Sequence, residues 1–135
     1  MSQEDNKAVV RRLVEDLFNT GELDVVDEVF ADDYVDHTAS PPDLPGPENV
    51  RRSVSEWLDA FPDTVSAAQD VIAEGDGVAA RWSTRATHRG EFMGVPPTGG
   101  RIDVTWFGIF RLSGGRIVES WDTFNVAEVM QQLRR

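Results

Sequence analysis

The chain has 135 residues, a formal net charge of −11 and no cysteine. This length suits a single domain, residues 1–135, with a hydrophobic core of its own. The acidity argues against binding to nucleic acid or to an anionic membrane surface, and the lack of cysteine excludes disulfides and thiolate chemistry. Residues 2–7 are polar and no apolar run reaches the length of a membrane span, so we expect a cytoplasmic protein.

The first part of the sequence predicts three helices. Ser2 is suited to cap the first, in which apolar residues recur at helical spacing over residues 9–18. A second, short helix is expected over residues 24–30. A proline-rich connector at residues 41–47 then leads into a third helix, which begins at Pro47 and ends near Phe61. These three helices are expected to precede every strand.

The second part changes to the period of strands. Strands are predicted over residues 65–74, 78–88 and 102–112, with glycine-containing turns after the first and the third. A fourth strand follows Gly115, and a terminal helix covers residues 126–133. Helices first and long antiparallel strands last predict an α+β fold, in which a strongly curved antiparallel sheet forms a cone closed by the N-terminal helices.

A cone of this kind encloses an apolar pocket with few polar groups, which is the usual setting for a small hydrophobic ligand. The opposite face of the sheet still carries Phe107, Ile109 and Trp121. Large apolar side chains gathered on one face mark an interface. We therefore expect a homodimer that packs through this outer face.

One face of the fourth strand holds a single acidic residue among mostly apolar neighbours. Alternation places Val118, Ser120, Asp122 and Phe124 on a single face. A carboxylate held against apolar side chains has its charged form disfavoured, so its pKa rises and it becomes able to exchange a proton near neutral pH. The alternative is a half-exposed aspartate at the end of a strand.

Several runs of sequence resemble the SnoaL-like polyketide cyclases of the nuclear transport factor 2-like superfamily: DDYVDH, THRGEFMGVPPTGG, FGIFRLSGGRIVESWD and VMQQL. The resemblance covers nearly the whole chain in the right order. It implies a cone-shaped α+β fold and a cofactor-free intramolecular aldol condensation of a polyketide-like ester or ketone. It also implies one acid/base aspartate after the tryptophan of the motif, which is Asp122 here.

The sequence departs from this family at three inward positions. Ser120 replaces a histidine found in many relatives, and Trp106 and Gly108 align with a glutamine and a histidine of the family's cyclases. None of the three residues can ionise as histidine does. The resemblance therefore implies a pocket that is more apolar than in the known cyclases and has fewer donors for an enolate.

His88 and His37 are further catalytic candidates. His88 shares a strand face with Trp82, and the glycine-rich loop that follows could fold it over the pocket mouth; His37 lies where a helix gives way to a loop. The alternative for each is an imidazole bound to local backbone carbonyls. Fifty-one positions separate them and no third ligand lies close in sequence, so no metal site is expected.

The loop over residues 89–100 is predicted to act as a lid, because its glycines allow movement and it carries apolar side chains. Asp36 belongs to an acidic run that is expected to be a solvated turn or cap. Residues expected to contact the substrate are aromatic, belong to the 89–100 loop or share the strand face of Asp122: Tyr34, Trp57, Trp82, Phe92, Met93, Trp106, Phe110, Ser120 and Phe124.

Two rival functions stay open. Arg101 and Asp103 share a strand face and resemble part of the water-activating arrangement of limonene-type epoxide hydrolases, although an exposed ion pair at the start of the strand explains them better. The same cone also suits a non-catalytic protein that binds a lipophilic molecule. An aspartate at the base of a closed apolar cavity favours catalysis, whereas an aspartate paired with arginine or turned outward favours binding.

Overall fold

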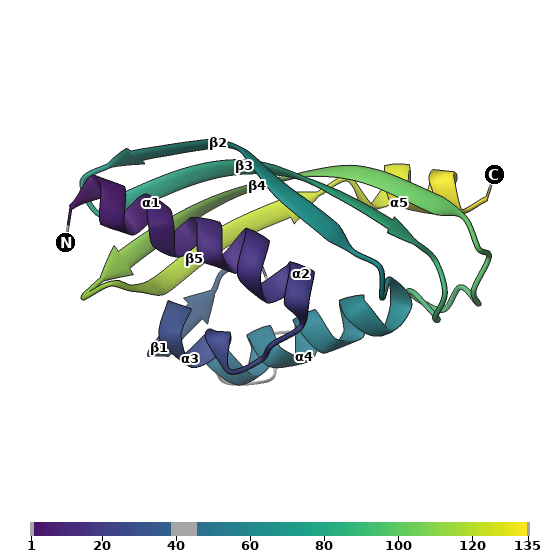
Figure 1. The fold of residues 1–135 in the computed structure, drawn as a ribbon, viewed down its shortest axis with the longest axis horizontal. Coiled ribbons are helices and arrows are strands. Elements are labelled where there is room, and N and C mark those ends of the chain that lie inside the picture. Colours follow the sequence, from purple (N-terminus) through teal and green to yellow (C-terminus); the bar gives the residue numbers. More distant parts are fainter. Residues whose placement is uncertain (1, 39–45, 135) are drawn as a thin grey trace.

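The computed structural model describes residues 2–38 and 46–134, which form an α+β fold in which a curved sheet arches over the helices (Figure 1). The sheet order is β1-β5-β4-β3-β2, with β1 parallel to β5 and the other pairs antiparallel. The strands are β1 (Phe30–Asp36), β2 (Val65–Glu74), β3 (Gly77–Thr87), β4 (Arg101–Ser113) and β5 (Arg116–Phe124). The helices are α1 (Gln3–Arg12), η1 (Leu13–Leu17), α2 (Phe18–Thr20), α3 (Val25–Val29), α4 (Gly46–Ala60) and α5 (Val126–Leu133).

The predicted α+β class is confirmed, and the sheet is strongly curved but not closed. β1 and β2 stand at opposite edges of the described sheet, and the space between these edges is covered by helices (Figure 1). In the part of the chain that the structure describes, no helix is both long enough and apolar enough to cross a bilayer.

The first helix begins where the sequence predicts. Ser2 and Asp5 form a capping box: the Asp5 backbone N–H donates to the Ser2 hydroxyl at 3.0 Å, and the Ser2 N–H donates to the Asp5 carboxylate at 3.2 Å. A π-helical turn, η1, continues α1 without a break, and the helix ends at Gly21 in the left-handed conformation with φ of 71°. The helix thus buries its apolar stripe against one part of the inner face of the sheet, chiefly β2 and β3.

β1 corrects the expectation that three helices precede every strand. The short helix α3 ends at Val29, and the chain then runs parallel to β5 with Phe30 opposite Ile117 and Asp36 opposite Ser120. The sequence signal is weak because only Phe30 and Tyr34 are buried in β1, while most of the acidic residues between and after them face solvent. The proline-rich connector predicted at residues 41–47 lies largely outside the described residues, and α4 begins at Gly46.

The four long strands follow the predicted order and turns. Every second residue from Val78 to Ala86 on β3 is buried, and the same alternation runs along β4 from Ile102 to Leu112. The buried apolar side chains form two clusters: the first joins α1, η1 and α3 to the first half of α4, and the second joins the end of α4 to α5. Phe18 and Trp106 pack against both clusters, so they mark the boundary between them.

A bulge in β5 corrects the predicted face of its first residues. Arg111 of β4 pairs with Glu119, but the next residue, Leu112, pairs with Ile117, so Val118 is the extra residue. The insertion reverses the alternation: Ile117 is fully buried on the inner face, where it joins Ser120. The prediction that Val118 shares a face with Asp122 is therefore wrong.

Candidate functional site

A cavity of about 740 Å³ opens between the inner face of β4 and β5, helix α4 and the loop that follows β3. It lies at the boundary between the two apolar clusters, where side chains from both leave a gap. Its lining combines aromatic rings with four carboxylates and three hydroxyls: Phe18, Asp36, Thr38, Ser53, Glu56, Trp57, Glu91, Phe92, Met93, Trp106, Asp122, Thr123, Phe124 and Val126.

The aromatic wall is built around Trp57 of α4. Its ring meets Phe92, Trp106 and Phe124 edge-on, with centroids 5.7, 5.5 and 6.0 Å away. The Trp57 indole N–H donates to the Thr64 hydroxyl at 3.0 Å, which fixes the orientation of the ring. Edge-to-face packing of this kind is favourable and rigid, so the wall is preformed.

Asp122 reaches the cavity because its cross-strand partner is a glycine. Asp122 pairs with Gly108 of β4, and a Cβ at Gly108 would lie 3.2 Å from the Asp122 Cβ and 2.9 Å from the ring of Phe110. In real structures a Cβ atom essentially never comes within 3.0 Å of a heavy atom outside its own residue and the two neighbouring residues. The missing side chain at position 108 therefore provides the space that the aspartate and the aromatic ring share.

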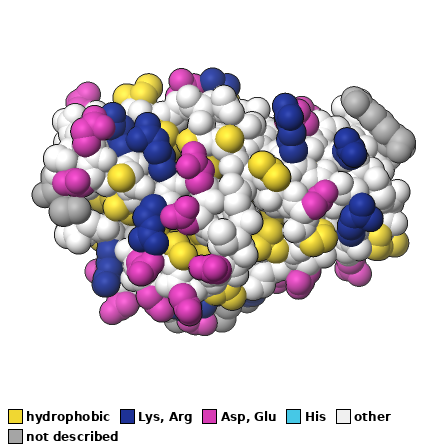
Figure 2. Space-filling model, in the orientation of Figure 1, with side chains coloured by type: hydrophobic (Ala, Val, Ile, Leu, Met, Phe, Trp, Pro, Cys, Tyr) yellow, Lys and Arg dark blue, Asp and Glu magenta, His cyan; other side chains and the backbone are white. Residues whose placement is uncertain are grey.

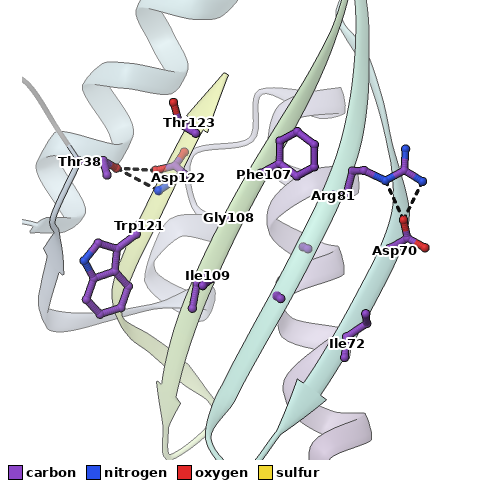
Figure 3. Close-up of a pocket in the computed structure, with 12 residues that line it drawn as sticks. Thr38, Asp70, Ile72, Arg81, Phe107, Gly108, Ile109, Trp121, Asp122 and Thr123 are labelled. Carbon is purple, nitrogen blue, oxygen red and sulfur yellow. Dashed lines mark hydrogen bonds and ion pairs between the residues drawn. The ribbon is translucent and has the colours of Figure 1, made fainter. Parts of the chain in front are cut away.

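Thr38 holds Asp122 from the end of β1 (Figure 3). The Thr38 Oγ1 accepts a hydrogen bond from the Asp122 backbone N–H at 3.0 Å and lies 3.1 Å from Asp122 Oδ1, to which it can donate. Burial, and then the negative charge of Asp36, raise the pKa of Asp122 to about 6, while the Thr38 hydrogen bond opposes them. Near neutral pH the carboxyl group can thus both accept and return a proton.

Asp36 and Thr38 are site residues that the sequence interpretation missed. Both the backbone N–H and the hydroxyl of Thr38 lie 3.0 Å from Asp36 Oδ1, which makes a tight turn after β1. The parallel pairing of β1 with β5 carries this turn to the side of Asp122. The Asp-x-Thr spacing is a turn signal that could have indicated the local hydrogen bonds, but nothing in the sequence indicated the partner strand.

Residues 8–133 match the family model of SnoaL-like polyketide cyclases. The chain belongs to the SnoaL-like polyketide cyclase family. It is 30% identical over 118 residues to aklanonic acid methyl ester cyclase DauD of Streptomyces sp. (strain C5), covering 84% of this chain and 72% of DauD. IdmH of Streptomyces antibioticus is 34% identical, with a TM-score of 0.81 over the full length of both chains. TsrD from Streptomyces laurentii, 22% identical, shares the fold with a TM-score of 0.90 over 98% of this chain and 97% of its own.

In this SnoaL-like cavity, five of the nine residues expected to contact substrate belong to the lining: Trp57, Phe92, Met93, Trp106 and Phe124. The other four lie behind it. Trp82 stacks on Trp106 with centroids 5.8 Å apart, and Phe110 in turn packs on Trp82 at 6.2 Å. The buried Tyr34 hydroxyl is 2.6 Å from the Ser120 hydroxyl, so these two groups bind one another, and burial raises the pKa of Tyr34 above its ordinary value.

His88 lies buried at the base of the loop after β3 and is not among the residues that line the cavity. It is fully buried, and its Nδ1 accepts the backbone N–H of Thr98 at 3.2 Å, so that nitrogen carries no hydrogen. The His88 backbone also bonds to Gly99 and Gly100, which ties the two ends of the loop together. Burial and these bonds place its ring inside the loop base, away from the cavity lining, and within the described part of the chain the hydrogen bonds of the ring are to Thr98 and not to the backbone carbonyls of the alternative.

His37 lies on the opposite face of the sheet from the cavity. Its ring stacks on Trp121 with centroids 4.5 Å apart, and its Nε2 is 2.9 Å from Glu119 Oε2. His37 does not take the expected position at the pocket mouth, because Asp36 and Thr38 on either side of it line the cavity while its own ring stacks on Trp121. Within residues 2–38 and 46–134, no three histidine, aspartate or glutamate side chains gather as a metal-binding group.

The loop after β3 covers one side of the cavity with apolar side chains. Phe92 and Val95 exchange two backbone hydrogen bonds, at 3.0 and 2.9 Å, and the Phe92 ring packs on Trp57 and on Phe61. Met93 lines the cavity although it is 65% exposed. Phe92 and Met93 therefore both line the cavity, which is the position that a lid over the cavity requires.

Arg101 and Asp103, the basis of the epoxide hydrolase alternative, lie away from the cavity. Both are exposed at the start of β4, and Asp103 is 3.5 Å from Arg85 in an exposed ion pair. They border a separate polar depression on the surface. Their exposed placement argues against a water-activating group, and the ion pair that Asp103 forms is with Arg85 of β3.

Proposed function

We propose that this protein is a cofactor-independent cyclase that closes a ring in a small apolar polyketide-like ester or ketone, with Asp122 as the acid/base group. The observation that carries the proposal is a carboxyl group with a raised pKa at the edge of an aromatic-walled cavity of about 740 Å³. The similarity to an aklanonic acid methyl ester cyclase supports an ester as the substrate.

The reaction needs one proton carrier. The Asp122 carboxylate removes a proton from a methylene flanked by a carbonyl, and the resulting enolate carbon attacks a second carbonyl carbon of the same molecule. The new alkoxide then takes the proton back from Asp122. The product is an isomer of the substrate, and the carboxylate is regenerated without any net gain or loss of protons.

The aromatic wall supplies the second part of the catalysis. A flexible chain must fold until its two reacting carbons meet, and holding them together lowers the barrier by up to roughly 7–11 kcal/mol in ideal cases. Flat rings such as Trp57, Trp106 and Phe124 suit a planar conjugated substrate. The hydroxyls of Ser53 and Thr123 also line the cavity and are the candidates to donate to the enolate oxygen.

Turnover by Asp122→Asn tests the proposal. The probes are linear β-keto methyl esters and, separately, aklanonic acid methyl ester, the compound in the name of DauD; the product of unchanged mass is followed by chromatography and mass spectrometry. We expect the wild type to form a cyclic isomer and the variant to lose 10²-fold to 10⁴-fold in rate while still binding the ester. Normal turnover by the variant would overturn the role of Asp122; binding of the ester by both proteins with cyclisation by neither would support the non-catalytic alternative.

We also propose that the protein forms a homodimer through the outer face of the sheet. Ile72, Phe107 and Ile109 are 67%, 53% and 50% exposed there, beside Trp121, and the four side chains project from strands β2, β4 and β5 (Figure 3). A shallow depression of about 590 Å³ runs across these side chains. An apolar surface of this extent is typical of an interface.

A further inference from the structure

We infer that Thr38 and Asp36 are positioning residues that set the proton affinity of Asp122, because the single Thr38 hydroxyl hydrogen is shared between the two carboxylates. The inference deepens the proposed function, since it assigns a partner to the proposed acid/base group. It also makes a statement about the folded protein that holds whether or not a substrate is present.

The geometry allows only one of two hydrogen bonds at a time. Thr38 Oγ1 lies 3.0 Å from Asp36 Oδ1 and 3.1 Å from Asp122 Oδ1, and it accepts the Asp122 backbone N–H at 3.0 Å. A hydroxyl has one hydrogen, so it donates to one carboxylate or to the other. Asp36 keeps the backbone N–H of Thr38 at 3.0 Å in either case.

Asp122 depends on this hydroxyl more than Asp36 does. Among the hydrogen bonds found in the described residues, the Thr38 hydroxyl is the one donor to the Asp122 carboxylate. When Asp122 is ionised, the hydroxyl stabilises it. When Asp122 has taken a proton, the hydroxyl can turn to Asp36, which is still charged, so each state of Asp122 has a satisfied arrangement.

The charges around Asp122 act in the opposite direction to the hydroxyl. Asp36 approaches from β1, Glu56 from α4 and Glu91 from the loop after β3, and all three line the same cavity. No lysine, arginine or histidine is among the described lining residues. The Tyr34 hydroxyl of β1 faces the same region but is bound to Ser120. Negatively charged neighbours favour the protonated form of Asp122. Asp36 is the one of these carboxylates that shares the Thr38 hydroxyl with Asp122.

The two residues therefore have opposite effects, which a titration can separate. The Asp122 carboxyl carbon of the full-length ¹³C-labelled protein is followed by NMR from pH 3 to pH 9, without any ligand. Thr38→Val should raise the pKa of Asp122 by at least about 0.5, and Asp36→Asn should lower it by at least about 0.5. Thr38→Ser, which restores the hydroxyl, should titrate within about 0.3 of the wild type.

Thr105→Val is the matched control, because Thr105 is an exposed threonine on β4 that is not among the described residues lining the cavity. It should leave the titration unchanged. Amide spectra of every variant confirm that it is folded; where Thr38→Val fails this check, Thr38→Ala replaces it. Shifts in the same direction for the Thr38 and Asp36 variants, or no shift in either, would overturn the inference.

The outcome is distinguishable from a failure of the proposed function. If the pKa of Asp122 shifts in opposite directions in the Thr38 and Asp36 variants but the protein turns over no ester, the roles of Thr38 and Asp36 stand and the cyclase proposal is refuted. Loss of turnover in Asp122→Asn without opposite shifts would leave the cyclase proposal standing and remove the role of Thr38. Where a substrate is turned over, the acidic limb of the pH profile of kcat/KM should move in the same directions as the NMR titration.

Discussion

Asp122 lowers the stability of the protein at the pH where it is proposed to work. Its pKa is raised from 3.8 to about 6, mainly by burial, so the folded state binds a proton more tightly than the unfolded state does. Below about pH 4 Asp122 is protonated in both the folded and the unfolded state, so its titration does not change the free energy of unfolding. As the pH rises from about 4 to about 6, the free energy of unfolding falls. The loss is at most about 3 kcal/mol, and partial solvent access reduces it.

Asp122→Asn should remove this pH dependence. We expect the variant and the wild type to differ little near pH 4, and the variant to be equally stable or more stable at pH 7, where the wild type carries the partly buried charge. Denaturant unfolding at the two pH values measures the difference. A sharp loss of stability at pH 7 in the variant would mean that the ionised Asp122 is a structural partner.

Gly108 sets the space available to the proposed acid/base group. Gly108→Ala would bring a Cβ within 2.9 Å of the buried Phe110 ring, so we expect a loss of about 1–3 kcal/mol in stability and a displaced Asp122. Gly77→Ala on β3 is the control, because its Cβ would meet nothing closer than 3.5 Å. Thermal unfolding compares the two variants, and equal stability would contradict the crowding argument.

At the scale of elements, the site depends on two segments that hold few buried residues. β1 contributes Asp36 and leads into Thr38, and its place in the sheet depends on the pairing with β5. The loop after β3 contributes Phe92 and Met93, and its ends are held by His88. β1 adds two buried aromatic residues to the core, Phe30 and Tyr34, whereas the side chains that the loop contributes, Phe92 and Met93, line the cavity.

The loop provides the test at this scale. Replacing Phe92 and Met93 together by alanine should weaken ligand binding far more than it lowers the melting temperature, because Met93 is largely exposed and Phe92 packs on the cavity wall. Binding of the ester, or of an environment-sensitive apolar dye, is measured beside thermal unfolding. His88→Ala is the contrasting variant and should lower stability first. Equal losses of binding and stability in the double variant would make the loop merely structural.

At the scale of the molecule, the two faces of the sheet have different chemistry. The helical side presents interspersed acidic and basic side chains with small apolar patches between them (Figure 2). The opposite face presents the apolar group Ile72, Phe107, Ile109 and Trp121. Two copies with a net charge of −11 each repel one another, so the apolar contact must overcome that repulsion.

Ile109→Asp should therefore dissociate the proposed dimer into a particle of 15.0 kDa while the fold persists. Val65→Asp is the control, since Val65 is also exposed but borders a different depression. Sedimentation at micromolar concentration measures the mass, and added salt should strengthen association of the wild type by screening its charge. A wild type that sediments only at 15.0 kDa would remove the argument.

Local patterns in the sequence were enough to predict most of the fold. Capping at Ser2, helical spacing in α1 and α4, and strict alternation along β3 and β4 each depend on neighbours within a few residues, and the structure agrees with them. The motif around Asp122 likewise indicated the family and a candidate carboxyl group. These signals are local because hydrogen bonding and burial within one helix or strand repeat with a short period.

The tertiary structure alone decided what surrounds Asp122. The pairing of β1 with β5 joins residues 84 positions apart, Thr38 and Asp122, and no local pattern encodes such a contact. The bulge at Val118 changed the face of Ile117, because one inserted residue reverses the alternation on which the prediction rested. The orientations of His37 and His88 depended in the same way on turns after their strands. The sequence thus determined the fold class and the candidate acid/base residue, whereas long-range pairing decided which groups control its charge.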